Sequence, residues 1–195
     1  MTNVIILGAT GSLARVATTL FLNERDVRLT LYVRKPRLLG EIDAAHVRVI
    51  EGDVLDTAKL TVAITGQDVV YANLAGDLVS MAESVVRAMH AAGVRRLVWI
   101  SSMGIYSEVP GERYGRVLDP YRDSAAVIEA SDLDWTILRP GWFNDDDEIS
   151  YETTRKGEAF RGHDISRRSL ASLVVKLATT PGLEVHQSLG VNTPV

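Results

Sequence analysis

The stretch Val4-Ile5-Ile6-Leu7-Gly8-Ala9-Thr10-Gly11-Ser12-Leu13-Ala14 decides the fold class of this chain. A run of apolar β-forming residues leads into a turn with two glycines, and the turn opens directly into a helical pattern. Gly8 permits the tight turn, Gly11 removes the side chain where a diphosphate approaches the backbone, and Ala14 lets the helix pack closely on the sheet. The free amides and the positive end of the helix then face the diphosphate. The residues predicted to hold it are Gly8, Thr10, Gly11, Ser12 and Leu13. A lone glycine pattern can also be a structural turn without a ligand.

Short apolar runs alternate with longer helical patterns along the rest of the chain. The predicted strands are Val4–Leu7, Val27–Val33, Val47–Glu51, Asp68–Ala72, Arg96–Ser101 and Trp135–Arg139, and the predicted helices lie near Leu13–Asn23, Thr57–Thr65, Leu78–Ala92 and Pro120–Ser131. In the third helix Met81, Val85 and Met89 share one face, and Gly93 follows at a C-cap position. This alternation predicts an α/β fold, a Rossmann-like doubly wound parallel sheet with helices on both faces.

The tail from Glu148 has a different pattern. Ile149–Thr154 and Glu158–Phe160, separated by Arg155-Lys156-Gly157, predict a small hairpin. Ser166 is predicted to cap a helix that runs to about Thr180, and a last strand near Val185–Val191 is expected at the sheet edge. We therefore expect a single domain over residues 1–195, with a cofactor-binding core over 1–140 and a short substrate-side, C-terminal segment over 141–195.

Composition excludes several classes of function. The chain has 195 residues, no cysteine and a formal net charge of −4. Without cysteine there are no disulfides, thiol nucleophiles or cysteine-ligated metals. The acidic balance argues against a nucleic-acid partner, because nonspecific binding needs a concentrated basic surface. No apolar stretch reaches the roughly 20 residues of a membrane span, and the first strand begins too early to leave room for a signal peptide. We expect a cytoplasmic protein without a membrane partner.

The glycine turn, Gly8–Ala14, resembles the GATGxxG/A motif of atypical short-chain dehydrogenase/reductases, particularly the NmrA-like and NAD(P)H-binding subgroup. Further segments that add to the likeness are Tyr32–Arg34, Gly52–Val54, Ile100–Ser102, Leu133–Gly141 and Ile165–Arg167. The resemblance covers nearly the whole chain. It implies a Rossmann fold and a nicotinamide dinucleotide cofactor, and it says much less about the reaction.

The end of the second strand indicates which nicotinamide cofactor is used. An acidic residue there binds the 2′-hydroxyl of NAD, whereas an arginine accommodates the 2′-phosphate of NADP. This chain has Arg34 and Lys35 at that point and no carboxylate until Glu41. NADP(H) is therefore favoured over NAD(H), with Arg34 and Lys35 at the phosphate. A solvated basic loop is the alternative interpretation.

The family resemblance assigns further cofactor contacts. An aspartate at the position of Asp53 accepts a hydrogen bond from the adenine amino group, and the backbone amide of Val54 helps. Residues lining the ribose side would be Asn73, Ala75 and Gly76, and the backbone of Pro140, Gly141 and Trp142 would meet the nicotinamide amide. Alternatively, Asp53 caps the next helix, and Trp142 and Phe143 are core residues.

The Tyr-x-x-x-Lys pair that the best-known relatives use in catalysis is absent from this chain. None of the six tyrosines has a lysine four residues later. Near the expected nicotinamide position, Tyr106 or Tyr121 could donate a proton, and Ser101 or Ser102 could orient a carbonyl group. Ordinary loop residues and a strand-end hydrogen-bonding pair are the alternative.

No metal site is predicted. Asn144-Asp145-Asp146-Asp147-Glu148 lacks the spaced oxygen ligands of a cation loop, so a solvated loop is the better interpretation. The histidines, which are scattered without a helical pair, are His46, His90, His163 and His186.

The sequence thus favours an NADPH-dependent oxidoreductase that reduces a small carbonyl, quinone or flavin-like substrate by hydride transfer. The missing Tyr-x-x-x-Lys pair leaves a second hypothesis open, a non-catalytic NADP(H)-binding redox sensor that reports to a regulated protein partner. A sugar-nucleotide epimerase or dehydratase is a weaker alternative, because about 55 residues after the core are too few for bulky substrate recognition. The oligomeric state is not readable from the sequence.

Overall fold

A computed structural model describes residues 1–40 and 47–195, so that Glu41 and His46 lie outside the described part of the chain. Its main sheet has the strand order β3-β2-β1-β4-β5-β6-β10-β8. The bounds are β1 Thr2–Leu7, β2 Val27–Val33, β3 Val47–Glu51, β4 Val69–Ala72, β5 Arg96–Ile100, β6 Asp134–Pro140, β8 Glu152–Arg155 and β10 Gln187–Asn192. All neighbouring pairs are parallel except β10 with β8. The run β3-β2-β1-β4-β5-β6 is the strand order of a doubly wound dinucleotide-binding sheet, which confirms the predicted fold class.

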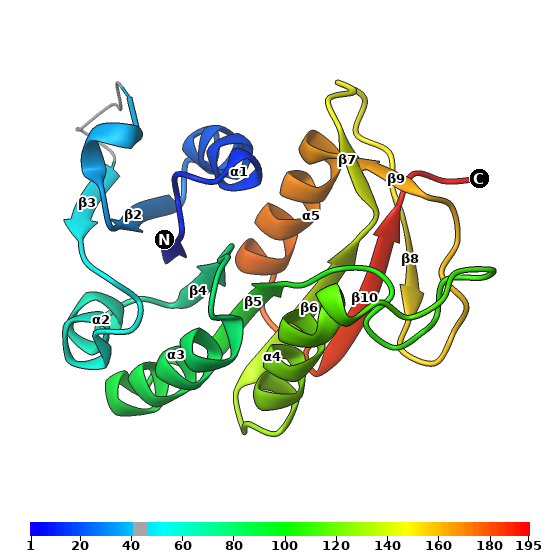
Figure 1. Ribbon diagram of the computed structural model, residues 1–195. Helices are drawn as coiled ribbons and strands as arrows, with labels where there is room; N and C mark the ends of the chain where they lie inside the picture. Colours follow the sequence, from blue (N-terminus) through cyan, green and yellow to red (C-terminus); the bar gives the residue numbers. More distant parts are fainter. Residues whose placement is uncertain (41–46) are drawn as a thin grey trace.

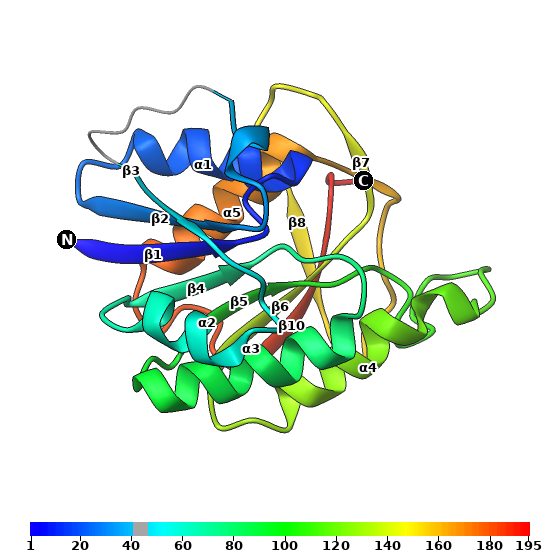
Figure 2. The same ribbon diagram turned by 60° about the vertical axis from the view of Figure 1, so that its left-hand side comes forward.

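Helices cover both faces of this sheet (Figures 1 and 2). Their bounds are α1 Ser12–Leu22, α2 Thr57–Ile64, α3 Leu78–Ala92, α4 Asp119–Glu129 and α5 Arg167–Thr179, with short 3₁₀ turns at η1 Pro36–Leu38 and η2 Arg116–Leu118. α1 packs beside α5 on one face, and α2, α3 and α4 lie together on the other. Because β1 is covered on both faces, its four buried residues, Val4–Leu7, are all apolar, without the alternation of a strand that has one face in water.

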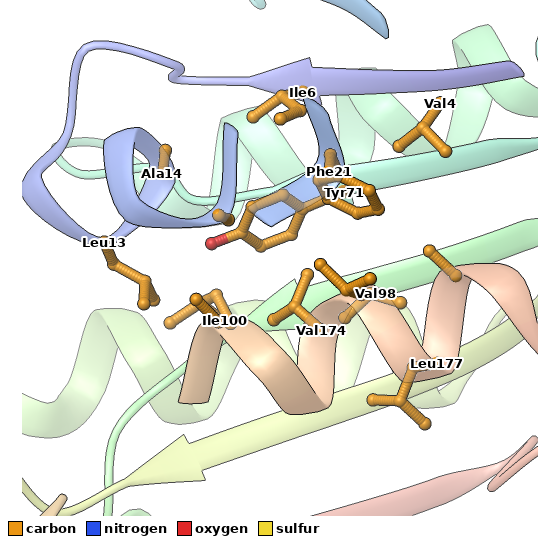
Figure 3. Packing of buried hydrophobic residues seen from close by; sticks show 14 of the residues in the cluster. Val4, Ile6, Leu13, Ala14, Phe21, Tyr71, Val98, Ile100, Val174 and Leu177 are labelled. Atoms are coloured by element: carbon orange, nitrogen blue, oxygen red, sulfur yellow. The ribbon is translucent and has the colours of Figure 1, made fainter. Parts of the chain in front are cut away.

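Alternate residues of β1 belong to the two cores that this arrangement creates. Val4 and Ile6 join the cluster under α1 and α5, whereas Ile5 and Leu7 join the cluster under α2, α3 and α4. Figure 3 shows the first cluster, in which Leu13 and Phe21 are packed with residues of the central strands and α5. Ala14 is fully buried there, which matches the role expected of a small residue at this position.

The helix ends follow the signals in the sequence. Gly93 ends α3 with a φ of +69°, a left-handed conformation that glycine adopts without strain. Ser166 caps α5, since its side chain accepts a hydrogen bond from the amide of Ser169. Both capping predictions are confirmed.

The predicted hairpin in the tail is wrong. Only Glu152–Arg155 forms a strand, and this strand, β8, pairs with β10 rather than with residues 158–160. Residues 158–160 form no strand, and Phe160 instead packs against Gly190 and is almost fully buried. As a result β8 occupies the sheet edge, and β10, which was expected there, lies between β6 and β8.

A second, two-stranded sheet was not predicted. It joins β7 (Trp142–Asn144) to β9 (Asp164–Ser166) in parallel. This sheet connects the end of β6 to the start of α5, above the carboxyl ends of the main strands (Figure 1). In the described residues, no helix combines the length and the apolar character that crossing a membrane requires.

Candidate functional site

A cleft of about 370 Å³ lies at the carboxyl ends of β1, β2, β3 and β4. β1 is the strand from which the chain proceeds outward in both directions, to β2 on one side and to β4 on the other, and open α/β sheets bind ligands at this switch point. Of the residues predicted to bind the cofactor, those that line this cleft are Gly8, Thr10, Gly11, Arg34, Lys35, Asp53, Val54, Asn73 and Ala75. The sheet topology therefore brings together segments that are far apart in the sequence.

The glycine turn is packed tightly against the end of β4. Gly8 has a φ of +78°, and a Cβ atom placed on it would overlap the carbonyl oxygen of Asn73. A Cβ on Gly11 would lie 2.6 Å from the Nδ2 atom of Asn73. Gly8 therefore has to be glycine, whereas a side chain at Gly11, which has a φ of −66°, would displace the side chain of Asn73.

The first turn of α1 carries the electrostatic features of an anion site. Gly11 is the N-cap residue of α1, so within the described residues no side chain caps the start of this helix, and its first turn holds no acidic residue. The first amides of a helix have no partner inside the helix, and the helix dipole gives this end a partial positive charge. A diphosphate group fits this cradle in charge and in the space that the glycines leave.

Arg15 joins the glycine turn to the loop that carries Arg34 and Lys35. Its Nε donates to the carbonyl oxygen of Thr10 over 3.1 Å, and its guanidinium also donates to the carbonyl oxygens of Leu38 and Leu39. Arg15 is not among the residues predicted from the sequence. The sequence feature that could have identified it is a long cationic side chain directly after Ala14, the small residue that ends the glycine motif.

Asp53 lies at the far wall of the cleft, where Tyr32 fixes its backbone. The hydroxyl of Tyr32 donates to the carbonyl oxygen of Asp53 over 3.0 Å. Burial, with smaller contributions from Asp56 and Asp53, raises the pKa of Tyr32 to about 12, so the hydroxyl stays a donor at neutral pH. The cap of α2 is Asp56 and not Asp53, whose carboxylate accepts the amide of Leu55 over 2.9 Å.

The residues expected near the nicotinamide follow β5 and β6, outside this cleft. Ser101 is buried, with its hydroxyl 3.4 Å from the carbonyl oxygen of Tyr121, while Ser102 is partly exposed. Pro140 accepts the amide of Met103 over 3.1 Å. A Cβ on Gly141 would overlap the carbonyl of His163, so this glycine is needed for close packing of the β7–β9 sheet.

Trp142 is not a core residue, since 62% of its surface is exposed, and Phe143 is 38% exposed. The ring of Trp142 lies 6.4 Å from that of His163, between centroids. The other predicted contacts outside the cleft are Ser12, Leu13 and Gly76. Leu13 points its side chain into the core (Figure 3), so only its backbone is free to meet a ligand.

Tyr106 lies apart from the cleft. Its hydroxyl donates to Glu129 Oε1 over 2.8 Å and lies 3.3 Å from Ser188 Oγ, and burial raises the pKa of this tyrosine above its usual range. Lys156 sits over its ring at 4.3 Å from the centroid. Tyr106 instead borders a separate cavity of about 350 Å³ formed with residues 107–110 and 157–159. Tyr121 is partly buried on α4 and packs against the core.

The acidic run after β7 is tied to the start of α5 by ion pairs. Asp145 pairs with Arg167 over 2.6 Å, and Asp147 pairs with Arg168 over 3.3 Å. Both carboxylates are highly exposed, as expected for a solvated loop. The described ranges, 1–40 and 47–195, contain no group of three or more side chains that could hold a metal ion.

This fold and this cleft define a Rossmann-type dinucleotide-binding protein of the atypical short-chain dehydrogenase/reductase kind. Comparison with known proteins agrees, because the profile of the NAD(P)H-binding family matches residues 8–181. The chain belongs to the NAD(P)H-binding family.

Three relatives illustrate the similarity. A Rossmann-fold NAD(P)-binding family protein from Shigella flexneri is 40% identical with a TM-score of 0.90, and the match covers 100% of this chain and 94% of that one. A short-chain dehydrogenase/reductase from Veillonella parvula DSM 2008, solved in complex with NADP, is 29% identical with a TM-score of 0.86, and the match covers 99% and 95% of the two chains.

The third relative is a (4-alkanoyl-5-oxo-2,5-dihydrofuran-3-yl)methyl phosphate reductase from Streptomyces griseus subsp. griseus. It is 29% identical over 72% of this chain, which spans about half (48%) of the length of that protein. The family is thus one of NAD(P)-binding, reductase-like proteins.

Proposed function

We propose that this protein is an NADPH-dependent oxidoreductase that reduces a small carbonyl, quinone or flavin-like substrate. One observation carries the proposal: the glycine turn, the uncapped start of α1 and the pair Arg34–Lys35 all border the same cleft. NADP(H) has two anionic parts, a diphosphate and a 2′-phosphate. The start of α1 with its glycine turn suits the diphosphate, and the cationic pair Arg34–Lys35 suits the 2′-phosphate.

Each part of the cleft then has a role. Arg34 and Lys35 bind the 2′-phosphate, and Arg34 can do so with two parallel hydrogen bonds because its guanidinium is planar. Asp53 accepts a hydrogen bond from the adenine. Residues assigned to the ribose and to the nicotinamide amide are Asn73, Ala75, Gly76, Pro140, Gly141 and Trp142.

The bound nicotinamide supplies the hydride, so the chain has to position the cofactor and the substrate rather than provide the reactive group. Ser101 or Ser102 orients the carbonyl oxygen of the substrate. The exposed rings of Trp142 and Phe143 offer an apolar surface for a flat molecule. Tyr121, whose backbone carbonyl oxygen lies 3.4 Å from the hydroxyl of Ser101, is the remaining candidate proton donor.

The relatives support the proposal in two ways. The Veillonella parvula protein was solved with NADP, and the Streptomyces griseus relative is described as a reductase. Both proteins are less than 30% identical to this chain, so they favour the cofactor and the reaction class without specifying the substrate.

Binding of NADPH and NADH tests the cofactor assignment. We expect NADPH to bind the wild type more tightly, and Arg34→Ala to weaken NADPH binding about tenfold or more, because a charge-assisted hydrogen bond is worth roughly 1.5–3 kcal/mol. Binding of NADH should change little. Arg87→Ala, which removes an exposed arginine of α3 that pairs with Glu83, is the matched control. Equal affinity for the two cofactors in the wild type would contradict the assignment.

A second candidate function is a non-catalytic NADP(H) sensor with a protein partner. The observation that favours it is the position of Tyr106, whose hydroxyl is bonded to Glu129 away from the cleft. Measuring NADPH oxidation over a panel of carbonyls, quinones and flavins separates the two functions. Turnover that falls in Tyr121→Phe supports the reductase, whereas tight binding of cofactor with no turnover on any substrate supports the sensor.

A further inference from the structure

Arg167 places a positive charge beside the glycine turn from a distant part of the chain. It is the first residue of α5, and its Nε lies 3.3 Å from the hydroxyl oxygen of Ser12, the first residue of α1. α5 packs on α1 and reaches β4 and β5, whereas Arg34 follows β2, which lies on the other side of β1 in the strand order. The two arginines therefore flank the start of α1 from opposite sides.

The guanidinium of Arg167 is held in place mainly by uncharged groups. It stacks over the ring of Phe143 at 5.2 Å from the centroid, and its Nη1 donates to the carbonyl oxygen of Asn144 over 3.3 Å. Only 24% of the side chain is exposed. This cation is thus partly desolvated and preorganised next to the amides that face the cleft.

Its carboxylate partner is held much more loosely. Asp145 pairs with Arg167 over 2.6 Å, but 87% of the Asp145 side chain is exposed. Exposed ion pairs contribute only about 0–1 kcal/mol, because water solvates the carboxylate nearly as well as the partner does. A phosphate held at the start of α1 can replace Asp145 at little cost. The glycine turn itself supplies no cationic side chain to that phosphate.

We propose that Arg167 is a cofactor-binding residue, which pairs with the nicotinamide-side phosphate of the diphosphate and gives up Asp145 when the dinucleotide binds. The nicotinamide side is indicated because Arg167 approaches α1 from the side of β4 and β5, opposite the Arg34 that is assigned to the adenosine end. Asp145 is then a competitor of the cofactor, and the acidic run sets the affinity of the cleft. This inference rests on the proposed dinucleotide function.

Titrations with NADPH and with adenosine 2′,5′-bisphosphate test it, because the second probe keeps the adenosine-side phosphates and lacks the nicotinamide-side one. We expect Arg167→Gln to weaken NADPH binding about tenfold and to leave the bisphosphate within about twofold of the wild type. Asp145→Asn should tighten NADPH binding by about two- to fivefold, since it removes a competing anion. Arg167→Lys should restore part of the lost affinity.

Arg168→Gln is the matched control, because Arg168 is the next residue of α5 and pairs with Asp147 over 3.3 Å on the exposed side. It should leave both affinities unchanged. Unaltered NADPH binding in Arg167→Gln would overturn the inference, and so would equal weakening by Arg167→Gln and Asp145→Asn, which is the result of a purely structural ion pair. If the wild type binds neither NADPH nor the bisphosphate, the proposed dinucleotide function fails. This outcome differs from the two results that would overturn the role of Arg167.

Discussion

Tyr71 is a buried residue whose hydroxyl group takes no part in the candidate site. Its side chain lies in the cluster under α1 and α5 (Figure 3) and is fully buried. Among the described residues, the hydroxyl has no hydrogen-bond partner. Burial raises the pKa of this phenol far above its usual range. A desolvated, unpaired hydroxyl costs free energy, so this position is not optimised for stability.

We therefore expect Tyr71→Phe to raise the free energy of unfolding by about 1 kcal/mol at pH 7. The pKa is higher in the folded state, so the unfolded chain releases the proton first, and the wild type loses stability as the pH rises above about 10. The variant should lose less stability over that range. Denaturant titrations at pH 7 and at pH 10.5 measure both effects.

Tyr32→Phe is the control for this prediction, since the hydroxyl of Tyr32 does have a partner, the carbonyl oxygen of Asp53. It should lower the free energy of unfolding by about 1 kcal/mol. A loss of stability in Tyr71→Phe as large as that in Tyr32→Phe would show that the Tyr71 hydroxyl is satisfied in solution.

Single residues of the cleft differ in how far the sequence predicts them. Gly8, Arg34 and Asp53 each follow a strand, so strand order alone brings them to one edge of the sheet. Arg15 and Tyr32 act through contacts with backbone carbonyl groups of other segments. Such contacts depend on loop geometry that no local pattern specifies.

At the scale of elements, the loop after β5 is anchored by a buried ion pair. Arg139 on β6 is fully buried and pairs with Glu108, which is 5% exposed. Glu108 also accepts the amides of Gly104 over 3.0 Å and Tyr106 over 2.8 Å. The loop therefore folds around one carboxylate, and this carboxylate determines where Tyr106 lies.

Glu108→Ala should destabilise the protein by about 3–5 kcal/mol, because removing one partner leaves the charge of Arg139 buried and unpaired. Thermal and denaturant unfolding measure the change. Glu83→Ala, which breaks an exposed pair with Arg87 on α3, is the matched control and should cost under about 0.5 kcal/mol. A small effect of Glu108→Ala would mean that water reaches Arg139.

The elements of the tail show why local pattern fails there. Residues 149–160 alternate in the manner of two strands with a glycine turn between them, but the hydrogen-bonding partner of β8 is β10, more than 30 residues later. Two strands of a hairpin and an edge strand with a distant partner have the same local signature. The tertiary structure distinguishes the two cases, because Phe160 is buried against Gly190 and its segment does not pair with β8 as a strand.

At the scale of the whole molecule, the tail serves the core as well as the site. α5 contributes buried residues such as Leu170, Val174 and Leu177 to the cluster under α1, and β10 extends the parallel sheet. The β7–β9 sheet brings Trp142 and Phe143 to the carboxyl edge. The strands and helices of residues 1–140 follow from periodicity and glycine placement, whereas the proposed site also includes residues of the tail, which no local pattern brings to the cleft.

A crystal structure of the complex with NADPH tests the central claim most directly. We expect the diphosphate at residues 8–13, the 2′-phosphate at Arg34 and Lys35, the adenine beside Asp53 and the nicotinamide directed toward Ser101 and Pro140. Arg167 should have exchanged Asp145 for a phosphate oxygen. NADPH bound in any other cavity, or a glycine turn that remains empty at saturating NADPH, would contradict the account.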